Sequence, residues 1–293
     1  MKAKRSRRII LTGATGFLGR RLAVLLAAAG YQVVGVTRDA SSLRCQGIPV
    51  QEWISWSAQL PNRLVPDVLI HTSTEYGHNG TSAAEINVAN VEQPLGLWQQ
   101  CAHHGARLIA ADTFFCKADG AYAHLSLYAQ SKAQFAIEAT RIAHASHVPA
   151  TFALIEHMYG PGDSPAKAIP GLVRQIVHST ERIALTDGGQ RRDFIHVDDV
   201  ARAFATILAA AAAPGTSVVG VGTGQATSMK ELLLLIHARA GSAAVLGFGD
   251  LPRRAGEFEC SVADTTALGL LGWKAAVTLV HGVDELIAEA RRP

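Results

Sequence analysis

The chain has 293 residues, 48% of them hydrophobic, which is enough to bury one large core or two unequal lobes. Its net charge is only +3, and the basic cluster within residues 2–8 is too short to indicate nucleic-acid binding. No apolar run reaches membrane-spanning length, and the twelve histidines lack the spacing of metal ligands. The cysteines also show no paired spacing: Cys45, Cys101, Cys116 and Cys260. We therefore expect a cytoplasmic protein with reduced thiols, no metal site and no membrane partner.

A glycine-rich turn near the start of the chain lies between two expected strands. Residues 8–11 and 31–37 are apolar runs typical of buried strands, and residues 20–29 favour a helix that Gly30 ends. This order of elements is the dinucleotide-binding unit, in which glycines let the backbone approach a pyrophosphate at the helix N-terminus. The residues of the turn that we expect to bind the dinucleotide are Gly13, Thr15, Gly16, Phe17, Leu18 and Gly19.

The residue after the second strand bears on the choice between NAD and NADP. An acidic side chain there would bind the ribose hydroxyls, but this strand ends in Thr37 and Arg38. A guanidinium matches the geometry of a phosphate, so the sequence favours NADP. Asp39 follows directly and leaves NAD open, and Arg38 could also be a solvated charge at the end of a strand.

Strands and helices continue to alternate along the chain, which predicts a parallel sheet with helices on both faces. The further expected strands and long helices are 65–71, 84–104, 107–111, 128–147 and 151–155. The fold class that follows is α/β, a doubly wound Rossmann sheet with a smaller C-terminal substrate-binding lobe.

Shorter elements fill the second half of the chain, after a break in the alternation near residue 160. We expect residues 1–160 to form mainly the Rossmann domain and residues 161–293 mainly the lobe. Residues 192–223 are expected to return to the Rossmann sheet.

A tyrosine and a lysine on the second long helix carry the expected chemistry. Tyr128 and Lys132 are four residues apart, so on a helix they share one face. An ammonium beside a phenol favours the phenolate, which makes the tyrosine a usable proton donor or acceptor. By itself this spacing is weak evidence for a catalytic pair. It becomes strong evidence here because the pair follows a dinucleotide-binding unit and lies on the helix after an expected strand.

These features, with several further strings, resemble the extended short-chain dehydrogenase/reductases, which include nucleotide-sugar epimerases, dehydratases and reductases. The matching strings are residues 66–71, Asn87-Val88, 159–162, 192–200 and 271–273. The resemblance implies hydride transfer at a sugar carbon, with Tyr128 as acid or base and Lys132 also holding the nicotinamide ribose. It further implies that Thr72, Ser73 and Asn87 contact the cofactor, and that the two long helices form a homodimer.

The chain departs from the family pattern at two positions. The family's catalytic serine or threonine falls on Ala111, and we expect Thr113 to supply the hydroxyl because residues two apart share a side of a strand. Family dehydratases carry an Asp-Glu pair, but here Thr113 follows Asp112 where the glutamate would stand. The resemblance therefore argues against 4,6-dehydration.

Within the family, residues 70–77, 112–117 and 155–161 resemble the nucleotide-sugar 4-ketoreductases of the CDP-abequose synthase kind. This implies reduction of the C4 ketone of a nucleotide-linked 6-deoxy or dideoxy hexose by NADPH. A 4-epimerase that retains NAD is the main alternative. A non-catalytic NADP sensor is a remote one, because a sensor would not need the Tyr/Lys pair.

A nucleotide-sugar substrate needs cations for its diphosphate. Arg192 and Arg254 are the candidates, since the planar arginine fork binds phosphate oxygens, and residues 254–257 resemble the family's Arg-x-Gly-Asp string. Arg192 could instead form a structural ion pair with a neighbouring aspartate. Glu75 and Tyr76 follow a strand's carboxyl end and are expected to line the sugar pocket.

Overall fold

The structure is a computed structural model that describes residues 7–56, 59–77, 80–117, 126–253 and 256–292. These residues form two compact units. The described parts of 1–117 and 124–154 make up the first unit together with 201–219, and the second unit comprises 155–200 and 220–292. The chain thus passes between the units several times. The predicted boundary at residue 160 and the predicted return of residues 192–223 stay predictions.

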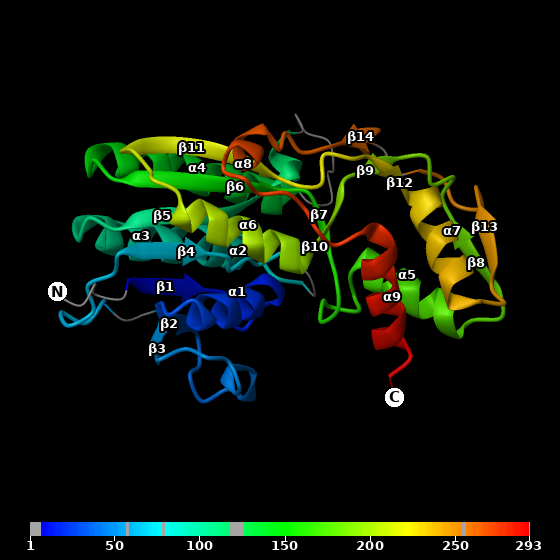
Figure 1. Cartoon of the computed structure of the whole chain (residues 1–293), viewed down its shortest axis with the longest axis horizontal. Helices are drawn as coiled ribbons and strands as arrows, with labels where there is room; N and C mark the ends of the chain where they lie inside the picture. Colours follow the sequence, from blue (N-terminus) through cyan, green and yellow to red (C-terminus); the bar gives the residue numbers. More distant parts are fainter. Residues whose placement is uncertain (1–6, 57–58, 78–79, 118–125, 254–255, 293) are drawn as a thin grey trace. The chain divides into compact units, whose positions relative to one another are not determined.

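The first unit is built on a seven-stranded sheet with the order β11-β6-β5-β4-β1-β2-β3 (Figure 1). The strands are β1 (Arg8–Thr12), β2 (Gln32–Thr37), β3 (Glu52–Ser55), β4 (Val68–His71), β5 (Arg107–Thr113), β6 (Pro149–Ile155) and β11 (Gly215–Val221). β1 pairs in parallel with both β2 and β4. β11 runs in the same direction as β6, because Gly215 N donates to Val148 O and Glu156 N donates to Val221 O. The expected doubly wound parallel sheet is confirmed.

Helices cover both faces of this sheet. Successive side chains of a strand point to opposite faces, and because consecutive residues of β1, β2 and β4 are buried, both faces must be covered. One face packs on α3 (Gln93–His103) and α4 (Ser126–Ala145) through a core that includes Trp98 and Phe135. Trp98 Nε1 donates to Ala139 O and so joins these two helices. α1 (Phe17–Ala28) and α6 (Val197–Ala209) lie on the opposite face (Figure 1).

The first expected long helix is interrupted. Instead of one helix over 84–104, the structure has α2 (Ala83–Asn87), a π-helical segment η2 (Val88–Glu92) and then α3. Pro94 has no N–H to give to the Asn90 carbonyl, and the helix widens at this point. Such a widened turn changes which side chains face the sheet.

The second unit has a core between three helices. Apolar side chains of α5 (Ala168–His178), α7 (Met229–Ala240) and α9 (Leu279–Ala290) meet there, among them Val173, Ile236 and Val283. The small strands around them are β7 (His157–Tyr159), β8 (Arg182–Leu185), β9 (Arg191–Arg192), β10 (Phe194–His196), β12 (Thr227–Ser228), β13 (Val245–Phe248) and β14 (Cys260–Ser261). Short helical turns complete the described chain: η1 (Leu43–Cys45), η3 (Phe114–Lys117) and α8 (Thr266–Leu270). In the described part of the chain, no helix is long and apolar enough to cross a membrane.

A buried carboxylate fixes the segment before α9. Asp199, in the first turn of α6, accepts from Ala276 N at 2.9 Å and from Val277 N at 2.9 Å. Both carboxylate oxygens are used, and the residue is fully buried. The loop's amides are thereby satisfied inside the protein rather than by water.

We expect Asp199→Asn to lower the free energy of unfolding by about 2 kcal/mol, because an amide can accept at only one of its two ends. The matched control is Asp198→Asn, whose side chain is half exposed. Chemical denaturation of both variants measures the difference. Equal stability of the two variants would contradict the assigned role.

Candidate active site

The turns after β1 and β4 meet at the point where the strand order reverses, which is where open α/β sheets bind ligands. Gly13 has a φ of +69°, and a Cβ on it would lie 2.7 Å from Ser73 N. A Cβ on Gly19 would overlap the Gly13 carbonyl oxygen. The glycines at these two positions are therefore required by the close approach of backbones.

The N-terminus of α1 is suited to a phosphate. Among the described residues no side chain caps it, and its first turn holds no acid. In contrast, α2 and α7 begin with capping boxes, in which Ser82 and Ser228 are paired with Glu85 and Glu231. Because the positive end of a helix dipole stabilises an anion, the α1 turn fits a dinucleotide pyrophosphate.

The predicted turn residues surround this helix start. The Thr15 carbonyl accepts from Arg20 Nε at 3.1 Å, and Leu18 is buried under the helix. The Phe17 ring lies 5.4 Å from the Arg21 guanidinium. These contacts fix the turn against α1.

The end of β2 presents a guanidinium rather than a carboxylate. Arg38 is exposed directly after the strand. Asp39 Oδ1 accepts from Ser41 N at 2.9 Å and from Ser41 Oγ at 2.6 Å. These hydrogen bonds lower the pKa of Asp39 and hold its carboxylate within its own turn.

Tyr128 and Lys132 are buried on α4, with 6% and 3% of their surfaces exposed. Lys132 Nζ donates to the Ala111 carbonyl of β5 at 2.6 Å. The Tyr128 ring is 5.0 Å from the Tyr76 ring and 6.3 Å from the Phe115 ring, measured between centroids. The two predicted catalytic residues thus lie beside the carboxyl ends of β4 and β5.

The hydroxyl of Thr113, at the end of β5, accepts a hydrogen bond within its own turn. Thr113 is buried, and its Oγ1 accepts from Phe115 N at 3.3 Å. Ala111 is two residues earlier on β5, so both share one side of the strand. Thr113 therefore places a hydroxyl on the same side of β5 as Ala111, the position at which the family has its serine or threonine.

A buried asparagine that the motif analysis missed joins the loop after β4 to α4. Asn90 Oδ1 accepts from Glu75 N at 2.7 Å, while Nδ2 donates to Glu75 O at 2.8 Å and to Ser131 Oγ at 3.0 Å. Ser131 precedes Lys132 and donates to Tyr128 O at 2.8 Å. Asn90 thus supports both the Glu75–Tyr76 loop and the helical turn that carries the Tyr/Lys pair.

Asn87, the asparagine singled out from the sequence, points elsewhere. Its side-chain amide donates to Glu92 Oε1 at 2.8 Å in an exposed contact. Its predicted contact with a cofactor stays a prediction. The signal that could have identified Asn90 is Pro94, since a proline four residues later distorts a helix at that point.

Arg192 lies in the second unit and is almost completely buried. Nη1 donates to the carbonyls of Arg191 and Phe258, and Nη2 lies 3.2 Å from Glu257 Oε1. Glu257 thus pairs with Arg192, while Asp193 binds backbone amides such as Thr223 N. Arg254, the second predicted diphosphate ligand, lies outside the described residues.

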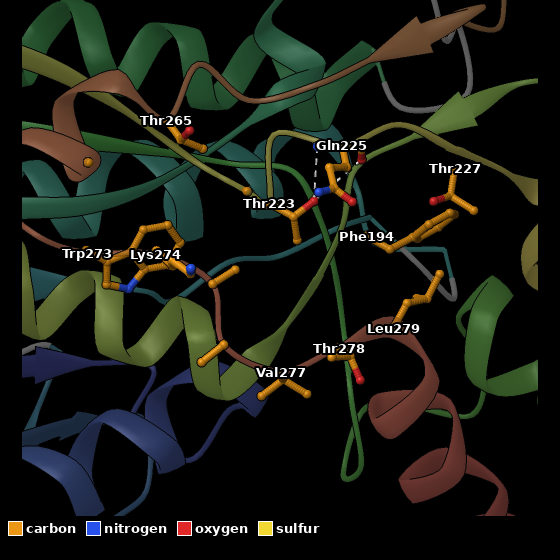
Figure 2. Close-up of a pocket in the computed structure, with 14 residues that line it drawn as sticks. Phe194, Thr223, Gln225, Thr227, Thr265, Trp273, Lys274, Val277, Thr278 and Leu279 are labelled. Carbon is orange, nitrogen blue, oxygen red and sulfur yellow. Dashed lines mark hydrogen bonds between the residues drawn. The ribbon is translucent and has the colours of Figure 1, made fainter.

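A cavity of about 550 Å³ lies within the second unit (Figure 2). Figure 2 shows Thr223 and Gln225 on one wall, with Gln225 N donating to Thr223 Oγ1, and Val277 to Leu279 on another. Of the predicted site residues that the structure describes, none lines this cavity. All of its lining residues belong to the second unit, whereas Tyr128 and Lys132 belong to the first.

We expect Asn90→Ala to lower the free energy of unfolding by roughly 2–3 kcal/mol, since it removes one buried and two part-buried hydrogen bonds and leaves the Glu75 N–H and carbonyl without them. Asn87→Ala is the control and should change stability by less than about 0.5 kcal/mol. Denaturant titration without any ligand compares them. A reversed order of the two effects would show that Asn90 does not tie these elements together.

Comparison with known proteins agrees with this architecture. Residues 9–222 match the NAD dependent epimerase/dehydratase family. The CDP-abequose synthase of Salmonella typhimurium is 33% identical over 289 residues, covering 95% of this chain and 97% of that protein. The dTDP-L-rhamnose 4-epimerase of Burkholderia thailandensis is 24% identical, covering 96% and 94%.

Solved structures share the fold over nearly the whole chain. MoeE5 in complex with UDP-glucuronic acid and NAD is 26% identical, with a TM-score of 0.80 and coverage of 97% of this chain and 99% of that one. The UDP-glucose 4-epimerase of Thermotoga maritima superposes with a TM-score of 0.79 at 20% identity, covering 97% and 98%. The resemblance inferred from the motifs is confirmed: this chain belongs to the NAD-dependent epimerase/dehydratase family.

Proposed function

We propose that this protein reduces the C4 ketone of a nucleotide-linked 6-deoxy or dideoxy hexose with hydride from NADPH. The observation that carries the proposal is the buried Tyr128/Lys132 pair, in a chain that is 33% identical over its length to a CDP-abequose synthase. The turns at Gly13 and Ser73 would hold the dinucleotide, with its pyrophosphate at the start of α1.

NADP is favoured over NAD by the charges after β2. Arg38 is exposed at the protein surface, where its guanidinium would meet a 2′-phosphate, while Asp39 accepts hydrogen bonds from Ser41. Arg44 is a second exposed guanidinium on the same loop, and Arg20 Nη2 anchors that loop by donating to the Arg44 carbonyl at 2.7 Å. Guanidinium groups bind phosphate oxygens in a bidentate manner, which a ribose hydroxyl cannot match.

The bound cofactor would supply the hydride that adds to C4. The Tyr128 hydroxyl would give its proton to the oxygen at C4, so that the ketone becomes an alcohol and the tyrosine a phenolate. The Lys132 ammonium, held by the Ala111 carbonyl, would stabilise this phenolate until a solvent proton restores it. The Thr113 hydroxyl would orient the ketone oxygen in place of the side chain missing at Ala111.

Binding energy far from C4 would hold the ketone in place for the reaction. Glu75 and Tyr76 would line the sugar pocket, since the Tyr76 ring packs on the Tyr128 ring. Arg192 and Arg254 would bind the diphosphate, with Glu257 holding the Arg192 guanidinium in a fixed orientation. A homodimer through α3 and α4 is part of the proposal, and Ile137 is an exposed apolar residue on α4.

A nucleotide-sugar 4-epimerase with retained NAD is the second candidate. The likeness to MoeE5, whose structure holds UDP-glucuronic acid and NAD, favours it. An epimerase returns the hydride to the sugar and shows no net consumption of cofactor, whereas a reductase oxidises one NADPH for each ketone.

The decisive experiment supplies 4-keto-6-deoxyhexoses linked to CDP, dTDP, GDP and UDP and follows NADPH oxidation. We expect oxidation with at least one of these nucleotides and formation of the C4 alcohol. If none is reduced while simple nucleotide sugars are epimerised, the epimerase is the correct assignment.

We expect Tyr128→Phe to lower kcat by at least about 100-fold, because it removes the transferable proton. Cofactor affinity should stay close to that of the wild type, since only a hydroxyl is lost. The control for loss of a tyrosine hydroxyl is Tyr31→Phe, because Tyr31 directly precedes β2 and is not on α4. Retention of most activity in Tyr128→Phe would exclude Tyr128 as the acid.

Arg38→Ala should weaken NADP⁺ binding by about tenfold to a hundredfold and leave NAD⁺ binding nearly unchanged, because it removes a charged partner of the 2′-phosphate alone. Arg141→Ala, which breaks an exposed ion pair with Glu138 on α4, is the control. Isothermal titration of both dinucleotides measures the effect. An equal loss for NAD⁺ and NADP⁺ would contradict a contact with the 2′-phosphate.

A further inference from the structure

A buried histidine that the proposed chemistry does not use lies at the centre of the cofactor edge. His71 is the last residue of β4 and is 1% exposed. It pairs across the sheet with Thr12, the last residue of β1, and its Nδ1 lies 2.8 Å from Thr12 Oγ1. The hydrogen bond therefore joins the two strands immediately before their turns.

The surroundings of Thr12 fix the direction of this hydrogen bond. Thr12 Oγ1 accepts from Thr72 N at 3.2 Å and from Ser73 N at 3.3 Å. Because these two donors occupy its lone pairs, the Thr12 hydroxyl donates its own hydrogen to His71 Nδ1. His71 Nδ1 must then be an acceptor, and the neutral ring carries its proton on Nε2.

Two neighbouring features keep the ring neutral. Burial and, to a smaller extent, the charge of Lys132 hold the pKa of His71 well below its ordinary value. A protonated ring would place a second buried cation near the Lys132 ammonium. Nδ1 therefore stays an acceptor throughout the neutral pH range.

The Phe135 ring of α4 lies near both His71 and Lys132. The Phe135 ring lies 4.9 Å from the His71 ring, and Lys132 Nζ lies 5.9 Å from the same Phe135 ring. Within the described part of the chain, His71 Nε2 has no hydrogen-bond partner. Among the described residues, the hydrogen bond of the His71 ring is therefore the one to Thr12.

We propose that His71 is a positioning residue that joins the turns after β1 and β4 into one cradle for the cofactor. Its acceptor nitrogen orients the Thr12 hydroxyl, and Thr12 in turn holds the amides of Thr72 and Ser73. The Thr72 hydroxyl closes the arrangement by donating to Thr12 O at 2.8 Å. The inference rests on the proposed function only in that these turns bind a dinucleotide.

The cradle has little tolerance for misplacement, which is why a single hydrogen bond would matter. A Cβ on Gly13 would lie only 2.8 Å from Thr72 Oγ1, so the turn after β1 lies directly against the turn after β4. Loss of the Thr12 orientation would let the second turn move relative to the glycine turn. Dinucleotide affinity would then fall, whatever reaction follows.

The test separates the acceptor from the bulk of the ring. His71→Phe keeps an aromatic ring but removes the acceptor, while His71→Asn keeps an acceptor near the position of Nδ1 and removes the ring. Thr12→Val removes the hydroxyl and Thr12→Ser retains it. NADP⁺ and NAD⁺ are titrated into each purified variant without substrate, and unfolding is measured without any ligand.

We expect His71→Phe and Thr12→Val each to weaken binding of the preferred dinucleotide by about tenfold, the size of one lost buried hydrogen bond. The double variant should bind no more weakly than either single variant. Thr12→Ser and His71→Asn should retain affinity within about threefold of the wild type. The unfolding measurements should show coupling between the two positions in the same double-variant cycle.

Wild-type affinity in His71→Phe, additive losses in the double variant, or a loss in His71→Asn as large as in His71→Phe would each overturn the proposal. If His71→Phe does not fold, His71→Leu takes its place in the comparison with His71→Asn, because leucine has a similar size to asparagine and no acceptor. A wild-type protein that binds a dinucleotide but reduces no 4-keto sugar refutes the proposed reaction and leaves this inference standing.

Discussion

The close approach of the turns after β1 and β4 is the constraint on which the rest of the site depends. Strand order reverses between these neighbours, so the chain leaves them in opposite directions and opens a crevice at their ends. The backbones touch at Gly13 and Ser73, which leaves no room for a side chain. The start of α1, the loop of Glu75 and the residues on α4 are all placed relative to this point.

The α4 pair depends on this arrangement through two different contacts. Lys132 Nζ donates to the Ala111 carbonyl of β5. Because this acceptor belongs to the backbone, substitution of the Ala111 side chain would not remove it. Asn90 contacts the same helix through Ser131, the residue before Lys132. A backbone acceptor and a buried amide thus fix the helical turn that carries Tyr128 and Lys132.

Features encoded by short spacings were predictable from the sequence. The glycine turn, the strand after it and the Tyr/Lys pair each need only a few consecutive residues, and the sheet followed from the alternation of elements. Asn90 was missed because its partners, Glu75 and Ser131, are 15 and 41 residues away. The pairing of Arg192 with Glu257 spans 65 residues and was likewise beyond local reasoning.

The π-helical segment between α2 and α3 limits how the length of the chain can vary. Each residue inserted in or deleted from a helix rotates everything beyond it by about 100°. A deletion between Ile86 and Trp98 would therefore turn either Asn90 away from Glu75 or Trp98 away from α4. Insertions and deletions among related chains should accordingly be excluded from this stretch and accommodated in the loops that flank it.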